Sequence, residues 1–98
     1  MNRVYSKIDK NILLLSLIRS SDVTENRTDL SPADELLQAS VKKLPKGMSF
    51  RPHKHNKLMR VTDTTQESWV FLSGKVLAKF YDLDDSLILE TVMRAGDC

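Results

Sequence analysis

The stretch Ser68-Trp-Val-Phe-Leu-Ser-Gly-Lys-Val-Leu-Ala-Lys-Phe-Tyr-Asp-Leu-Asp-Asp-Ser86 decides the fold class. Its apolar and β-branched runs are short, and turn residues interrupt them at Ser73-Gly74 and again at Asp84-Asp85-Ser86. In the run 75–83, residues Val76, Ala78 and Phe80 alternate with the residues between them, which is typical of a strand with one buried face. A further run, 87–94, follows the acidic turn. The stretch therefore predicts antiparallel β-structure.

Towards the N-terminus the same pattern continues. The run Met48–Arg51 ends at Pro52, and the run Leu36–Leu44 ends at Pro45-Lys46-Gly47. The second of these runs fits a helix as well as a strand, because Ser31-Pro32 resembles a helix start and the apolar residues after it suit either period. We expect an all-β antiparallel domain over 31–98.

Residues 1–30 differ in character and are expected to form an N-terminal helix or arm. The cluster Ile12–Ile18 places apolar residues on one face at helical spacing, and Asp9 is a suitable helix N-cap. The stretch 21–34 is polar and rich in turn residues, so it is a connecting segment. The sequence predicts one short helix before the β-domain.

Composition narrows the class of protein. With 98 residues, 41% of them hydrophobic, the chain is long enough for one core only. Its 15 basic and 13 acidic residues are interleaved and form no basic stripe, which argues against nucleic acid as a partner. The apolar stretch Ile12–Ile18 is far short of the roughly 20 residues of a membrane span, so we expect no membrane partner. The one cysteine, Cys98, excludes an intramolecular disulfide and favours a cytoplasmic location.

The candidate chemistry lies in Gly47-Met-Ser-Phe-Arg-Pro-His53-Lys-His55 and in Glu67. Two histidines one residue apart on a strand point to the same side, so both imidazoles can reach one ion. Glu67 precedes an apolar run, where a carboxylate is costly to bury unless a cation neutralises it. Two imidazoles and a carboxylate suit Zn²⁺, Fe²⁺, Mn²⁺ or Ni²⁺. A His-x-His pair in a basic loop is also often a solvated turn, and both interpretations remain open from the residues alone.

The spacing Gly-x5-His-x-His followed by Glu-x6-Gly resembles the first motif of the cupin family. It is carried here by Gly47, His53, His55, Glu67 and Gly74, although the interval of eleven residues between His55 and Glu67 is longer than usual. Over about 24–98 the chain also resembles small WbuC-type cupin-fold metalloproteins found among surface-polysaccharide biosynthesis genes. The segments that carry this likeness are 26–32, 50–55, 66–76 and 80–85. The resemblance implies a jelly-roll β-barrel, a strand over Leu36–Leu44 and a divalent metal held by His53, His55 and Glu67.

The same resemblance implies a function. It suggests a metal-dependent activity on a sugar or nucleotide-sugar; the alternative is a non-catalytic module that binds a carbohydrate or metabolite. Whether the domain is an enzyme stays open. An enzyme needs an acid–base group beside the metal ligands, and no clear one is evident; Tyr81 is the one phenol of the β-region. The residues 95–98 resemble the turn that opens the second cupin motif, whose further histidine is not in the sequence. We therefore expect a truncated product or a barrel completed by another chain, and association as a homodimer through Ile12–Ile18.

Overall fold

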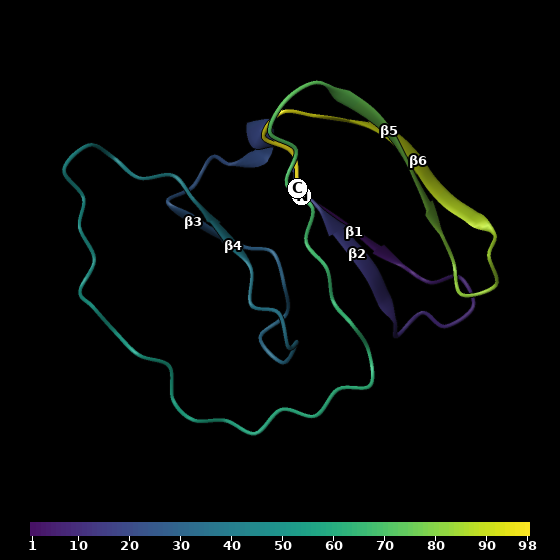
Figure 1. Cartoon of the computed structure of the whole chain (residues 1–98), viewed down its shortest axis with the longest axis horizontal. Helices are drawn as coiled ribbons and strands as arrows, with labels where there is room; N and C mark the ends of the chain where they lie inside the picture. The colour runs from purple at the N-terminus through teal and green to yellow at the C-terminus, as the bar shows by residue number, and fades with distance from the viewer.

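The computed structural model describes all 98 residues and is built mainly from β-strands (Figure 1). A single 3-10 turn is its one helical element. In chain order the elements are β1 (Asn2–Tyr5), β2 (Leu13–Leu17), η1 (Ser20–Asp22), β3 (Arg27–Asp29), β4 (Ser40–Lys42), β5 (Lys75–Tyr81) and β6 (Leu87–Arg94). The strands form three two-stranded antiparallel sheets, β1-β2, β3-β4 and β5-β6. The all-β class predicted from the sequence is confirmed, and the finer jelly-roll arrangement stays a prediction.

The C-terminal hairpin has the alternation that its sequence predicts. Val76 pairs with Met93, and Ala78 pairs with Thr91. Ala78 and Met93 are buried, whereas Leu77 between the inward positions is 57% exposed. The acidic turn closes through hydrogen bonds from the backbone N–H of Asp82 to the Ser86 carbonyl (2.8 Å) and from the Asp85 N–H to the Asp82 carbonyl (3.0 Å). The part of this face around Ala78 and Met93 therefore packs in the core, whereas Val76 on the same face is 45% exposed.

The predicted N-terminal helix is wrong, because Ile12–Ile18 contributes strand β2. This strand pairs with β1, with Val4 opposite Leu15. Nearly every residue of the cluster is apolar, so its pattern fits both the helical and the strand period, and pairing with β1 decides between them. Asp9 is a turn residue and not a helix cap: its side chain accepts the Asn11 N–H (2.9 Å) and its carbonyl accepts the Ile12 N–H (3.0 Å).

The core lies between the N-terminal and C-terminal hairpins. Leu17, Ala78 and Met93 form its buried centre, and the partly buried side chains around it are Leu15, Phe71, Phe80 and Leu89. The end of the chain lies beside this core: Cys98 exchanges two backbone hydrogen bonds with Ile18, at 2.7 and 3.0 Å. Phe71 exchanges two more with Gly96 and Asp97, at 2.7 and 3.0 Å, so residues 96–98 lie between Ile18 and Phe71.

The middle of the chain carries less regular structure than the sequence predicts. Of the ambiguous run Leu36–Leu44, only β4 is a strand. Residues 43–74 contain no strand or helix, so the runs at Met48–Arg51 and 68–72 do not form the strands expected of them. Figure 1 shows this segment as a wide arc between β4 and β5. No helix of the length and apolarity needed to cross a membrane occurs in the structure.

Candidate functional site

The two predicted histidine ligands lie side by side in the segment 43–74. Both side chains are exposed, and their ring centroids are 5.4 Å apart with the planes tilted by 55°. Two imidazoles bound to one ion at about 2.1 Å in tetrahedral geometry have centroids about 5 Å apart. The separation of His53 and His55 therefore fits a shared ion, although no strand imposes it. Just before them, Phe50 is held to β4 by the ammonium of Lys42, 4.6 Å above its ring centroid.

Glu67, the third predicted ligand, does not join this pair. Its exposed carboxylate accepts a hydrogen bond from the indole N–H of Trp69 at 3.2 Å. No three His, Cys, Asp or Glu side chains come close enough together to hold a metal ion. The eleven residues between His55 and Glu67 contain no strand, so no ladder fixes one ligand against the other. The structure brings two of the three predicted ligands together, and Glu67 as a ligand stays a prediction.

Glu67 borders a cavity of about 450 Å³ beside the core. The walls come from β2, β5, β6, the chain end and the segment before β5; the aromatic lining residues are Trp69, Phe71, Phe80 and Tyr81. Among the polar groups, Ser68 and Cys98 lie 3.5 Å apart (Oγ to Sγ). Exposed aromatic rings beside a carboxylate and a hydroxyl offer both a stacking surface and hydrogen-bond acceptors to a small polar ligand.

A second cavity, about 530 Å³, also borders β2 and shares part of its wall, including Glu67, with the first. Its wall is fixed by Gln66, whose amide oxygen accepts the Leu37 backbone N–H at 2.6 Å and whose amide nitrogen donates to the Glu35 carboxylate. These contacts connect the segment that carries Glu67 to the residues before β4. Glu67 is therefore positioned by its neighbours on both sides, Gln66 and Trp69.

Asp82 is a buried structural residue at the start of the acidic turn. The side chain is 5% exposed and accepts hydrogen bonds from the Ser6 hydroxyl (2.5 Å), the Lys7 N–H (2.7 Å) and the Leu83 N–H (2.8 Å). The Ser6 hydrogen bond, followed by the backbone donors, lowers the pKa of Asp82. These contacts join the β1–β2 turn to the β5–β6 turn, a long-range link that local sequence patterns do not reveal.

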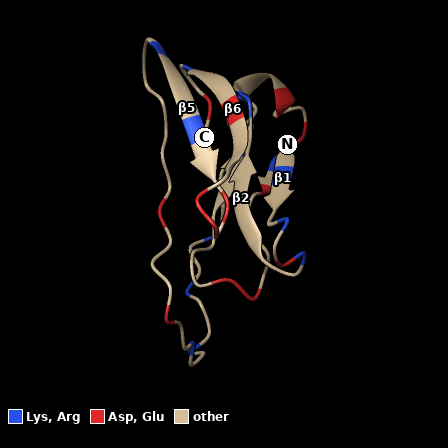
Figure 2. Ribbon diagram, turned by 90° about the vertical axis from the view of Figure 1, so that its right-hand side faces the viewer, with Lys and Arg blue, Asp and Glu red and all other residues tan.

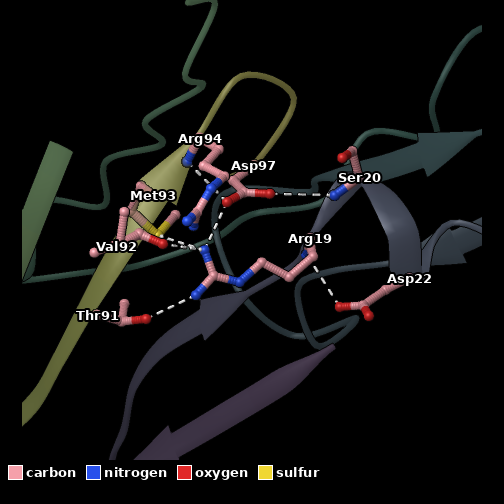
Figure 3. A network of polar contacts seen from close by, with 8 residues as sticks. All are labelled: Arg19, Ser20, Asp22, Thr91, Val92, Met93, Arg94 and Asp97. Atoms are coloured by element: carbon pink, nitrogen blue, oxygen red, sulfur yellow. Dashed lines mark hydrogen bonds and ion pairs between the residues drawn. The ribbon is translucent and has the colours of Figure 1, made fainter. Parts of the chain in front are cut away.

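Arg19 and Asp97 form a second long-range link, drawn in Figure 3. The Arg19 guanidinium donates to the Asp97 carboxylate (2.6 Å), the Thr91 hydroxyl (2.7 Å) and the Val92 carbonyl (2.8 Å). Asp97 is 4% exposed and also accepts the Arg94 N–H at 2.9 Å. The Arg94 N–H and then the Arg19 guanidinium lower the pKa of Asp97. This network fixes the chain end that borders the cavity.

No family model matches the chain, and no curated protein and no solved structure matches it either. The resemblance to cupins therefore rests on the motif residues themselves. The features that bear on it are the spacing of the histidine pair and the β-structure of the domain.

Proposed function

We propose that this chain is a metal-binding domain of the cupin type. Its hairpins belong to a jelly-roll arrangement, His53 and His55 bind a divalent transition metal, and Glu67 is the third ligand. The observation that supports the proposal best is the 5.4 Å separation of the two imidazole rings. Both rings are exposed, so an ion has access to them from solvent.

The donor set limits the choice of metal. Imidazole nitrogen suits Zn²⁺, Fe²⁺ and Ni²⁺, and one carboxylate added to two imidazoles also suits Mn²⁺. The histidine pair fits such an ion as it stands, whereas Glu67 has to approach the pair before it can bind. When bound, a metal of this kind would polarise a carbonyl or hydroxyl oxygen, which is chemistry that an activity on a sugar or nucleotide-sugar can use.

Metal titration of the purified chain tests the site. We expect His53→Ala and His55→Ala each to weaken Zn²⁺ or Ni²⁺ binding at least tenfold, because each removes one of two imidazole donors. Lys54→Ala, between them in the same exposed stretch, is the matched control and should leave affinity within twofold. Glu67→Gln reports the third ligand separately. Equal affinity in the parent and in the double histidine variant would show that the pair is not a metal site.

A non-catalytic carbohydrate-binding module is the second candidate, and the aromatic cavity favours it. Trp69 and Tyr81 are 62% and 54% exposed there, and the Glu67 carboxylate is hydrogen-bonded to the Trp69 indole. Trp69 is the single tryptophan, so its fluorescence reports this cavity alone. A fluorescence change on titration with nucleotide-sugars in the presence of a chelator, without product formation, would favour the binding module. Turnover that requires added metal would favour the enzyme.

A further inference from the structure

Strand β5 has an open edge along its whole length. Its one partner in the sheet is β6, which lies beside it in Figure 2. The backbone of β5 makes no hydrogen bond on the other side. At seven residues it is much longer than β1 to β4, which have three to five. The outer edge of β6 is partly covered, because the Arg19 guanidinium donates a hydrogen bond to the Val92 carbonyl there. An unprotected strand edge of this length is a template for pairing with another chain.

The contact of Arg19 also shows which residues of β5 offer their backbone groups. Val92 lies opposite Leu77, and its carbonyl points away from β5 towards Arg19. Leu77 and Val92 are therefore a non-hydrogen-bonded pair. In an antiparallel ladder both residues of a non-hydrogen-bonded pair direct their N–H and C=O groups outward. Leu77 therefore presents its backbone at the open edge. By alternation Lys75 and Lys79 do the same, whereas the backbone groups of Ala78 face β6.

The exposed area is large enough for a second copy to cover part of this chain. The accessible surface is 8157 Å², whereas a folded monomer of 11.2 kDa exposes about 5,700 Å². The excess, about 2,500 Å², is larger than the roughly 800 Å² that each partner contributes to a standard interface. The Cα radius of gyration, 15.6 Å, likewise exceeds the value of about 13 Å for a compact domain of this length. A homodimer has enough uncovered surface to form.

We propose that the open edge of β5 pairs antiparallel with β5 of a second copy, across a two-fold axis at Ala78. The two hairpins then form one four-stranded sheet in the order β6-β5-β5-β6. Among the registers centred on Leu77, Ala78 and Lys79, charge favours this one. A two-fold axis at Leu77 would place Lys75 opposite Lys79 of the other copy, and an axis at Lys79 would place two lysines directly opposite; like charges in such positions are destabilising.

The Ala78-centred register gives each exposed side chain a suitable neighbour. Val76, 45% exposed, lies opposite Phe80 of the second copy, which extends the core face across the axis. On the other face Leu77 lies opposite Lys79 of the second copy, whose methylene stem can cover it. The interface expected at Ile12–Ile18 stays a prediction. Leu17 and Ile18 are 6% and 2% exposed within their own chain, whereas Ile12 is 39% exposed.

Charge substitutions at Leu77 test the register, because its own cross-strand partner is the uncharged Val92. Leu77→Glu places a carboxylate opposite each Lys79 of the dimer, and Leu77→Lys places an ammonium there. In sedimentation equilibrium from low to high micromolar concentration at low salt, we expect the parent to be a dimer. The Leu77→Lys variant should dissociate at least tenfold more readily than Leu77→Glu, and added salt should reduce the difference.

Two controls keep the result specific to the β5 edge. Val61→Glu and Val61→Lys make the same changes of net charge at a position that is 92% exposed in the segment 43–74, and they should not differ from each other. Leu77→Pro removes one outward N–H while the bonds to β6 remain, so it should also weaken the dimer. A monomeric parent across the whole range, or a dimer in which the two Leu77 charge variants associate equally, would overturn the proposal.

Discussion

Replacement of Gly96 by alanine tests the close approach that holds the chain end against η1. Gly96 has φ +85°, and a Cβ built on it lies 2.9 Å from the Ser20 Cβ and 3.4 Å from the Ser20 Oγ. Its N–H donates to the Phe71 carbonyl at 2.7 Å, so this segment cannot move away without losing a backbone hydrogen bond. Alanine here meets both a disfavoured backbone conformation and a steric overlap.

The two contributions can be separated with Gly74. Gly74 has φ +78° but no atom within 4 Å of its Cβ position, so Gly74→Ala carries the conformational cost alone, about 1–2 kcal/mol. In Gly96→Ala an overlap with the Ser20 side chain adds about 1–3 kcal/mol. For a domain of this size each kcal/mol lowers Tm by about 4–8 °C. We therefore expect a clearly larger loss of Tm for Gly96→Ala than for Gly74→Ala.

Thermal unfolding followed by far-ultraviolet circular dichroism measures both variants. The double variant Ser20→Gly, Gly96→Ala removes the atoms that collide, so it should recover the steric part of the loss relative to Ser20→Gly alone. Equal destabilisation by Gly74→Ala and Gly96→Ala would refute the reasoning, since the contact with Ser20 would then contribute nothing.

Two further changes test the links around the core. The pKa of Asp82 is lowered in the folded chain. Its contribution to stability is therefore present above its unfolded pKa near 4 and is lost as pH falls through the folded value. Asp82→Asn should be less stable than the parent at neutral pH, and denaturant titrations should show this difference shrinking below about pH 4. Met93→Ala, at a position 2% exposed, should cost about 2–5 kcal/mol of unfolding free energy, whereas Met59→Ala, at 90%, should change it by less than about 0.5 kcal/mol.

The sequence predicted the local structure correctly where its apolar residues fit the period of a strand and not that of a helix. Residues 75–94 alternate between the two faces of a hairpin and carry a turn signal at Asp84-Asp85-Ser86, and β5 and β6 form there. The cluster Ile12–Ile18 carries no such restriction, because apolar residues occupy almost every position. Its conformation depends on pairing with β1, a tertiary contact, and the helix predicted from its spacing was wrong.

In the candidate site, too, the local arrangement was predictable and the long-range one was not. His53 and His55 are two residues apart, so their proximity is a local property, and the structure places their rings together. The position of Glu67 relative to them depends on the fold of the eleven residues between, which no sequence pattern fixes. The burial of Asp82 has a related cause: its partner Ser6 is 76 residues away, and nothing in the acidic turn itself signals that partner.

The position of Glu67 also depends on the chain end. Phe71 forms backbone hydrogen bonds with Gly96 and Asp97, and Asp97 is held by Arg19. Glu67 lies four residues before Phe71, and it borders the cavity that Phe71 and Cys98 also line. A change at Arg19 therefore acts on the cavity through a continuous series of contacts, although Arg19 lines neither the cavity nor the histidine pair. This series of contacts reaches the cavity but not the histidine pair, which lies apart from it in the segment 43–74.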